Sequence, residues 1–364
     1  MGAVDDLPLR DELRGKQPYG APQIDVAVRL NTNENPFAPS RAIIDSVVRE
    51  VAAAAAGLNR YPDRNAVALR TSLSSYVRRA TGCDIGPESV WPANGSNEVL
   101  QQLVQTFGGS GRRALGFEPT YSMHQLICRG TGTEYAQTNR EPDFSLNPDS
   151  AVASIVEHQP DIVFLCSPNN PTGTALDRDV VTAVYDATQG MVVVDEAYGE
   201  FSDRDSAMQA LPGRERLVVV RTMSKAFALA GARIGYAVAD SAVVDALQLV
   251  RLPYHLSSIS QAVALAALAH EAELLAHVDE LKRQRDRISE VLVDLGYVVL
   301  PSDANFVLFG GLDDQAGTWQ HLVDRGVLIR DVRLPGYLRV TAGTEQETDA
   351  FLEAITNITK ESVA

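Results

Sequence analysis

Cysteine is scarce in this sequence, with three residues in a chain of 364. Cys83, Cys128 and Cys166 are far apart, odd in number and without CxxC spacing. This pattern argues against a disulfide framework and predicts reduced cytosolic thiols, so we expect a cytoplasmic protein. The six histidines also lack the spacing of metal ligands, and we therefore expect no metal site.

Long apolar runs and an excess of basic charge are absent as well. No apolar stretch approaches the ~20 residues that a membrane-spanning helix needs, and the opening MGAVDDLPLRDELRGKQPYG is acidic and polar, unlike a signal peptide. Lys and Arg number 32 against 47 Asp and Glu, for a net charge of −15. That balance argues against general nucleic-acid binding. A few buried arginines can still create a local positive field for a small anion.

The sequence does contain an alternation of short apolar strands and amphipathic helices. We predict strands at 113–117, 161–166, 191–195, 217–221 and 234–238. Helices are predicted at 39–57, 65–82, 96–107, 120–130, 177–188, 260–292 and 345–360. Continuous Val, Ile and Leu runs suit strands buried on both faces of a mostly parallel sheet. The predicted fold class is therefore α/β.

Changes in composition and in the pattern of predicted elements along the chain also suggest domain boundaries. Residues 1–35 are interrupted by Pro and Gly and look like an N-terminal arm with one helical turn. A large domain is expected over 36–250, with its core at about 60–250, followed by connecting helices over 251–295. Residues 296–364 are expected to form a smaller α+β domain, to which the N-terminal segment contributes.

Polar residues follow several predicted strands at the point where each strand ends. Asp195 and Tyr198 follow one strand, Thr222, Ser224 and Lys225 follow another, and SPNNPTG (167–173) follows a third. Each stretch alone has an ordinary explanation as a turn, an N-cap or a helix start. Together they favour one ligand site, because ligands of open α/β sheets bind at the carboxyl ends of the strands.

In this order along the chain, these stretches resemble the fold-type-I pyridoxal-phosphate aminotransferases, and the histidinol-phosphate aminotransferase branch in particular. The resemblance implies a large domain with a mostly parallel seven-stranded sheet flanked by helices, plus a smaller α+β domain. It rests on LNTNENPFAPS (30–40), RYPD (60–63), ANGSNE (93–98), PTYSMH (119–124), SPNNPTG, VVDEAYGEF (193–201), RTMSKAFALAGARIGY (221–236), ANFVLF (304–309), LIRD (328–331) and LRVTAGT (338–344).

The resemblance implies chemical roles for the residues at the strand ends. The Lys225 amine would condense with the aldehyde of pyridoxal 5'-phosphate and later move a proton. Asp195 would pair with the pyridine nitrogen and keep it protonated. Asn169 and Tyr198 would hydrogen-bond the ring oxygen, and Tyr121 would stack on the ring face, although core packing is an alternative for that tyrosine.

Further residues would hold the two anionic groups of cofactor and substrate. Ser96, Asn97, Thr222, Ser224 and Arg233 would surround the cofactor phosphate, at a helix start that suits an anion. Tyr61 of RYPD would reach the cofactor phosphate of a neighbouring subunit, which implies a homodimer with shared active sites; a simple loop aromatic is the alternative. On the substrate side, the resemblance implicates Tyr19, Asn33, Arg330 and Arg339.

The implied reaction moves an amino group from glutamate to imidazole-acetol phosphate, giving L-histidinol phosphate and 2-oxoglutarate in histidine biosynthesis. An aromatic amino-acid aminotransferase is the main alternative, because it shares the cofactor residues. Decarboxylation of a phosphorylated amino acid stays open as well, whereas an intact Lys225 and Asp195 count against a cofactor-binding module that has lost catalysis. A metal hydrolase or a nucleotide-binding protein is disfavoured, since there are no clustered ligands and no GxxxxGK[ST].

Overall fold

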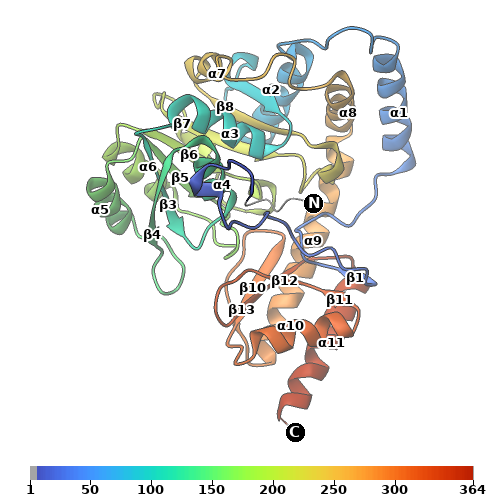
Figure 1. Cartoon of the computed structure of the whole chain (residues 1–364). Helices are drawn as coiled ribbons and strands as arrows, with labels where there is room; N and C mark the ends of the chain where they lie inside the picture. The colour runs from blue at the N-terminus through green and yellow to red at the C-terminus, as the bar shows by residue number, and fades with distance from the viewer. Residues whose placement is uncertain (1–5, 364) are drawn as a thin grey trace.

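A seven-stranded sheet forms the centre of the upper part of the molecule in Figure 1, which shows a computed structural model that describes residues 6–363. Its strands lie in the order β2 (Val90–Ala93), β8 (Gly235–Ala239), β7 (Leu217–Thr222), β6 (Met191–Asp195), β5 (Ile162–Cys166), β3 (Arg113–Glu118) and β4 (Glu134–Asn139). The pairs from β7 to β4 are parallel, whereas β8 is antiparallel to both β7 and β2. The predicted mostly parallel α/β sheet is therefore confirmed.

Helices cover both faces of this sheet because its central strands, β5, β6 and β7, are buried along their whole length and mostly apolar. Val193 and Val220 pack on one face with α3 (Ser96–Phe107), α4 (Met123–Thr131) and α7 (Ser241–Leu247). On the other face, Val192 and Val194 pack with α5 (Pro148–His158) and α6 (Arg178–Ala187), and Val219 packs with α2 (Val67–Thr81) and α8 (Ser258–Ala269). This alternation is the two-residue period of a strand buried on both sides.

A smaller unit lies below the large sheet in Figure 1. Its four-stranded antiparallel sheet has the order β12 (Arg330–Asp331), β13 (Tyr337–Thr341), β10 (Phe306–Gly310) and β9 (Val298–Val299). The helices α9 (Glu271–Asp294), α10 (Gln315–Asp324) and α11 (Glu345–Val363) cover it through an apolar cluster that includes Ile288, Leu322 and Phe351.

The N-terminal segment joins this smaller unit. Strand β1 (Val28–Arg29) pairs in parallel with β11 (Val327–Leu328), and the backbone continues the contact from Leu30 to Leu328 and Thr341. Short 3-10 turns complete the described structure: η2 (Asp11–Leu13), η3 (Pro87–Ser89), η4 (Gly199–Phe201), η5 (Ala207–Ala210) and η6 (Ala230–Ala232).

Two predicted helices differ from their sequence patterns for local reasons. Helix α1 (Arg41–Ala55) begins after Ser40, because the Ser40 hydroxyl accepts a bond from the Ile43 N–H and caps the first turn. The predicted helix 260–292 is divided at His270, where φ is −117°, into α8 and α9, which are bent by 74°. Within residues 6–363 no single helix is long and apolar enough to cross a membrane; the bent α8–α9 pair qualifies on length and composition alone.

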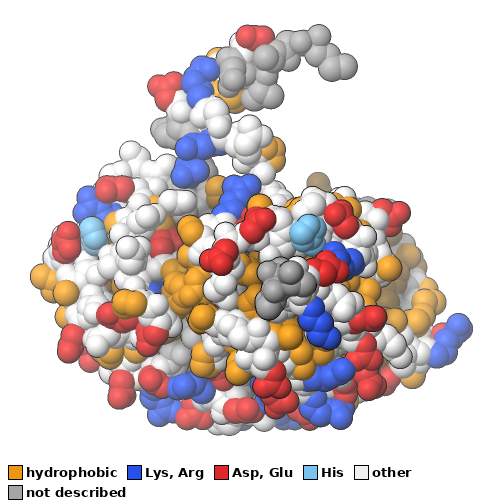
Figure 2. Space-filling view, turned by 90° about the horizontal axis from the view of Figure 1, so that it is seen from below, with side chains coloured by type: hydrophobic (Ala, Val, Ile, Leu, Met, Phe, Trp, Pro, Cys, Tyr) orange, Lys and Arg blue, Asp and Glu red, His pale blue; other side chains and the backbone are white. Residues whose placement is uncertain are grey.

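The outer surface of the smaller unit carries charge of both signs. Figure 2 shows Asp and Glu side chains interspersed with Lys and Arg around a group of apolar side chains on this face. A continuous basic stripe, which a nucleic-acid backbone would require, is not present on the face that this figure shows.

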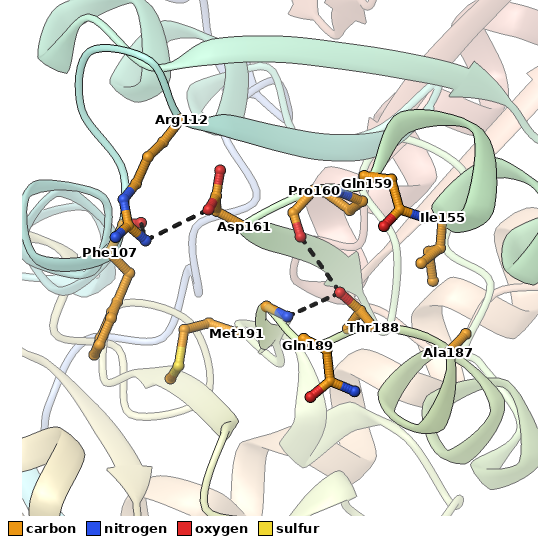
Figure 3. A pocket seen from close by; sticks show the side chains of 11 residues that line it. Phe107, Arg112, Ile155, Gln159, Pro160, Asp161, Ala187, Thr188, Gln189 and Met191 are labelled. Atoms are coloured by element: carbon orange, nitrogen blue, oxygen red, sulfur yellow. Dashed lines mark hydrogen bonds and ion pairs between the residues drawn. The ribbon is translucent and has the colours of Figure 1, made fainter.

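A small hollow of about 360 Å³ lies at the amino ends of β5 and β6, opposite the edge where the strands end (Figure 3). Arg112 contacts Asp161 there at 3.4 Å, and Thr188 Oγ1 donates to Pro160 O and accepts from Gly190 N. Because these polar groups already satisfy one another, we assign no chemistry to this hollow.

Candidate active site

A cavity of about 820 Å³ opens at the carboxyl ends of the strands, between the large sheet and the smaller unit. Its walls come from the N-terminal arm, the strand ends and the loop between β12 and β13. Thirteen residues singled out from the sequence line it: Tyr19, Asn33, Ser96, Asn97, Tyr121, Asp195, Tyr198, Thr222, Ser224, Lys225, Arg233, Arg330 and Arg339. The fold therefore brings together groups that are spread over the whole chain.

Lys225 follows β7 and extends into the cavity, where its Nζ donates to the Thr32 carbonyl at 2.9 Å. Burial lowers the pKa of this amine to about 8, and Arg339 and Arg233 add to the shift, while Glu34 opposes it. A lysine with this pKa is partly neutral near neutral pH. The neutral form is the one that attacks a carbonyl carbon or accepts a proton.

Asp195 ends β6 and is almost fully buried. Its Oδ2 lies 3.2 Å from His124 Nε2, and its Oδ1 accepts from the Ala197 N–H at 3.2 Å. His124 lies on α4, and its ring stacks on Phe164 with centroids 4.7 Å apart. This histidine fixes the orientation of the carboxylate, so Asp195 can meet a cation in the cavity with one defined geometry.

Tyr198 links the turn after β6 to the N-terminal segment. Its hydroxyl oxygen accepts from Asn33 Nδ2 at 2.8 Å and from Asn170 Nδ2 at 3.5 Å. Burial raises the pKa of Tyr198 to about 12, so the phenol stays protonated at neutral pH. Because its lone pairs are already used, the remaining O–H hydrogen is available to donate to an oxygen in the cavity.

The sequence assigned Asn169 to the cofactor's ring oxygen, but the structure does not bring this residue to the cavity wall. Asn169 is fully buried outside the cavity, where Nδ2 donates to Pro119 O and Thr172 Oγ1 and Oδ1 accepts from Thr120 Oγ1. Its neighbour Asn170 lines the cavity instead. A turn with two adjacent asparagines between prolines has no periodicity that reveals which side chain points inward.

An anion-binding corner lies where α3 begins. Ser224 Oγ accepts from Thr222 Oγ1 at 3.0 Å and from Arg233 Nη1 at 3.3 Å, and these residues lie beside Ser96 and Asn97 in the cavity wall. No side chain within the described residues caps the first turn of α3. The Glu98 N–H donates to the Gly95 carbonyl, which leaves the N–H groups of Ser96 and Asn97 for an anion.

Two glycines allow this corner to be so tight. A Cβ on Gly235 would lie 2.2 Å from the Ser96 nitrogen, and one on Gly95, whose φ is 84°, would lie 2.6 Å from Arg233 Nη2. Side chains at either position would therefore displace the helix start or the guanidinium. The corner is consequently shaped by backbone that only glycine permits.

Two arginines of the smaller unit form the opposite, cationic wall. Arg330 and Arg339 are directly paired across β12 and β13. Arg339 is buried, with Nη1 on Asn170 Oδ1 at 2.5 Å, Nη2 on Asn31 O at 3.0 Å, and Nε without a partner within the described residues. Burial lowers the pKa of Arg339 to about 10, and Arg330 adds to the effect. Two neighbouring guanidinium groups of this kind favour a doubly charged anion.

The tyrosines of the site differ in position. Tyr121 lies in the wall with its hydroxyl donating to Asn97 Oδ1 at 3.2 Å. Tyr19 is half exposed at the mouth, where Arg330 Nη1 donates to the neighbouring Gly20 O at 3.4 Å. Tyr61 lies outside the cavity and is 78% exposed, with its ring stacked on Tyr254 at 4.3 Å. The single chain therefore does not bring Tyr61 to the site.

Sequence reasoning missed His124, Asn170 and Glu34. His124 lies within PTYSMH, three positions after Tyr121, and this nearness to a residue already singled out was the available signal. Glu34 lies in NENP and lines the cavity near Lys225. Within residues 6–363, no group of three His, Cys, Asp or Glu side chains is placed to hold a metal ion.

These residues fit pyridoxal phosphate. The anion corner suits its phosphate, Lys225 suits its aldehyde and Asp195 suits its protonated ring nitrogen, while Tyr198 offers a donor for its ring oxygen. A cavity of about 820 Å³ has room for the cofactor and a small substrate together.

Comparisons with known proteins agree with this geometry. The model of the "Aminotransferase class I and II" family matches residues 25–355. The chain is 58% identical to a histidinol-phosphate aminotransferase of Mycobacterium avium, over 96% of this chain and 88% of that protein. It is also 58% identical to the one of Mycolicibacterium smegmatis, over 96% of this chain and 93% of that protein.

A comparison with a solved structure shows that the similarity extends to the three-dimensional fold. Histidinol-phosphate aminotransferase from Sinorhizobium meliloti, in complex with pyridoxal-5'-phosphate, superposes with a TM-score of 0.80 at 27% sequence identity. The match covers 93% of this chain and 92% of that one.

Proposed function

The chain belongs to the histidinol-phosphate aminotransferase family, within the class I and II aminotransferases, and we propose from this premise its substrates and the roles of its residues. It is a pyridoxal-phosphate-dependent transaminase. It transfers the amino group of glutamate to imidazole-acetol phosphate and yields L-histidinol phosphate and 2-oxoglutarate, a step of histidine biosynthesis. The observation that carries this proposal is the pairing of Arg330 with Arg339 in the cavity that holds Lys225.

The paired arginines account for both substrates. Histidinol phosphate carries a phosphate dianion, and glutamate carries a second carboxylate at the end of its side chain. Arg339 is held by Asn170 and Asn31, which leaves Nε free, while Arg330 is fixed at the mouth by Gly20. A doubly charged phosphate would relieve the repulsion between the two guanidinium groups, and a planar carboxylate would meet Arg339 in the same place.

The other residues have separate roles. Bound pyridoxal phosphate would supply an electron-accepting ring. Lys225, with its pKa near 8, takes the proton from the substrate carbon that bears the amino group and later returns a proton. Asp195, oriented by His124, would keep the ring nitrogen protonated. Tyr198, held by Asn170, would donate to the ring oxygen, and Tyr121 would pack on the ring face.

We also propose a homodimer in which Tyr61 completes the neighbouring site. Tyr61 and Tyr254 form an exposed aromatic pair, and further exposed apolar side chains accompany them: Ile44, Val48, Leu58, Val67, Leu249 and Leu252. The Tyr61–Tyr254 contact brings residues 58–67 and 249–254 together, and exposed apolar groups gathered in this way mark an interaction surface. The free cysteines and the biosynthetic role support a cytoplasmic location.

The substrate proposal predicts a strong preference for the phosphorylated amine. Wild-type enzyme should use histidinol phosphate with a kcat/KM at least about a hundredfold above that for phenylalanine or tyrosine, because an aromatic amino acid leaves the buried Arg339 guanidinium without its phosphate. Arg330→Ala and Arg339→Ala should each lower kcat/KM for histidinol phosphate by about one to three orders of magnitude, since deleting one partner of a desolvated pair costs about 2–5 kcal/mol. Half-reaction spectroscopy with each amine measures both effects.

Arg325→Ala is the matched control for these variants. Arg325 lies in the same unit but pairs with Glu361 on the surface, so its removal should leave the preference unchanged. Equal use of phenylalanine and histidinol phosphate by the wild-type enzyme would contradict the substrate proposal. The aromatic aminotransferase would then be the better assignment. Release of labelled CO2 in place of 2-oxoglutarate formation would indicate a decarboxylase.

The dimer proposal predicts complementation between two inactive variants. Tyr61→Ala and Lys225→Ala subunits, mixed at equal amounts, should regenerate native sites at up to about one quarter of the total, because a mixed dimer has one site in which both residues are intact. Lys225→Ala mixed with Asp195→Asn is the control, since both residues belong to the same chain's site and no native site can form. Absence of recovery after verified subunit exchange would show that Tyr61 does not act across the interface.

A further inference from the structure

Behind the cavity, one buried arginine joins the two segments that carry the reactive residues. Arg221 lies on β7 and donates through Nε and Nη2 to Glu196 Oε2, at 2.9 and 2.7 Å, and through Nη1 to Glu200 Oε1 at 2.9 Å. The three side chains are only 5–7% exposed. We call Arg221, Glu196 and Glu200 the Arg221 clamp.

The clamp lies on the reverse side of the strand ends. Successive residues of a strand point to opposite faces, so Asp195 meets His124 of α4 while Glu196 faces the other way. Likewise Thr222 belongs to the cavity wall, and Arg221 before it does not. The reverse side is the side of α2, since Tyr76 of that helix donates to Glu200 Oε1 at 3.2 Å.

Each half of the clamp is next to a proposed catalytic residue. Glu196 directly follows Asp195, Glu200 lies two positions after Tyr198, and Arg221 lies four positions before Lys225. The β6 turn and the end of β7 are otherwise joined here by the bond from Glu196 N to Val220 O at 2.8 Å. Holding both glutamates with one guanidinium therefore fixes Asp195 and Tyr198 relative to Lys225.

The groups around the clamp restrict the positions of Glu196 and of the Arg221 guanidinium. Glu196 also accepts from Ser206 Oγ at 2.7 Å and from the Ala207 N–H at 2.6 Å, so both of its oxygens are used. Gly199 packs directly on the guanidinium, because a Cβ there would lie 2.5 Å from Arg221 Cζ. Glu200 is held through Oε1 alone, by Arg221 and Tyr76, because its buried Oε2 has no partner within the described residues. Arg221 and Glu196, whose polar atoms are all used, have few alternative geometries.

We propose that Arg221 is a positioning residue for catalysis, which sets the placement of Asp195 and Tyr198 relative to Lys225 through Glu196 and Glu200. This inference rests on the roles proposed above for those three residues. Lysine at position 221 would keep the charge but present a single compact ammonium, which cannot bridge two carboxylates as the planar guanidinium does. The turn after β6 would then be held by one glutamate in place of two.

Arg221→Lys in the cofactor-loaded enzyme tests the proposal. We expect kcat for histidinol phosphate to fall by about tenfold to a hundredfold, while KM changes by less than about threefold. The reason is that small displacements of reacting groups slow the chemical step strongly. We also expect the pH midpoint of the visible cofactor band, measured without substrate, to rise by about half a unit to one unit. A weaker hydrogen bond from Tyr198 to the ring oxygen would cause this rise, because the weakening favours the protonated form of the cofactor that exists at low pH.

Arg216→Lys is the matched control. Arg216 directly precedes the same strand at its opposite end and donates to the Thr188 and Gly190 carbonyls, both at 2.7 Å. The Arg216→Lys protein should be less stable than the wild type, with unchanged kcat and pH midpoint. Wild-type values of both quantities in folded Arg221→Lys, or equal shifts in the two variants, would overturn the proposal and leave the clamp a purely stabilising feature.

A second variant keeps the test decisive where Arg221→Lys does not fold. Glu200→Gln retains the pair between Arg221 and Glu196 and should show smaller changes in the same directions; unchanged values in this variant would also overturn the proposal. The pH midpoint is independent of the substrate assignment, because no amine is added. A wild-type enzyme without a visible cofactor band would contradict the proposed role of Lys225, on which the role of the clamp rests. A wild-type band whose midpoint is unchanged in the variants would overturn the role of the clamp alone.

Discussion

Replacement of Lys225 by alanine should leave a folded protein that binds pyridoxal phosphate and turns over at least about 10²–10⁴ times more slowly, the scale of losing one positioned proton-transfer group. The phosphate corner formed by Thr222, Ser224 and Arg233 is untouched by the change, so cofactor affinity should be retained in large part. The lost rate has a definite cause. No other amine lines the cavity within the described residues, and the substrate carbon is left without a group to move its proton.

Two measurements check this result against a control. Borohydride reduction of wild-type enzyme followed by peptide mapping should place the cofactor on Lys225. Lys282→Ala, which removes a lysine paired with Asp203 at the surface, should keep full activity and the visible band. A reduced adduct on Lys16 or Lys282 in the wild-type protein would remove Lys225 from the mechanism.

The second large effect is expected at Asp195. Asp195→Asn should fold normally, because the amide is nearly isosteric and can still bond to His124 and the Ala197 N–H. Its kcat should fall by at least about 10², since a neutral partner does not hold the proton on the ring nitrogen that makes the ring an electron acceptor. Steady-state kinetics with histidinol phosphate and glutamate measures the loss.

Asp161→Asn provides the comparison for that variant. Asp161 precedes the neighbouring strand β5 at the opposite edge of the sheet, where it pairs with Arg112 (Figure 3). Its loss affects a charge pair of the same sheet far from the cavity, so any reduction in kcat should be small. Near-native turnover of Asp195→Asn would show that the carboxylate is not required.

The convergence of these residues on one cavity could be predicted from the sequence, because parallel strands gather their carboxyl ends at one edge. Asp195 and Lys225 follow apolar runs that could be recognised as buried strands, and β6 and β7 are indeed buried throughout. Their convergence then follows from the geometry of an α/β sheet. Two strands of the seven-stranded sheet, β2 and β4, were not predicted, and they lack this signal. β4, EYAQTN, is a polar edge strand, and β2, VWPA, is short and contains a proline.

Orientation within turns was harder to predict than position. Asn169 and Asn170 have the same chemistry, and only the folded turn shows that Asn170 reaches Arg339 and Tyr198. The link from Asp195 to His124 depends on packing between β6 and α4, which sequence spacing does not encode. The Arg221 clamp was hidden for the same reason, because its residues read as ordinary charged neighbours of a motif.

The pairing of β1 with β11 also sets the order in which the enzyme can be completed during its synthesis on the ribosome. Residues 28–33 emerge first, yet their partners Leu328 and Thr341 are translated near the end. The seven-stranded sheet can assemble while the chain is still being elongated, because its strands lie between residues 90 and 239. Thr32, whose carbonyl receives the Lys225 amine, has no fixed place until the last strand of the smaller unit exists. The active site therefore cannot be complete before the last strand of the smaller unit has been translated.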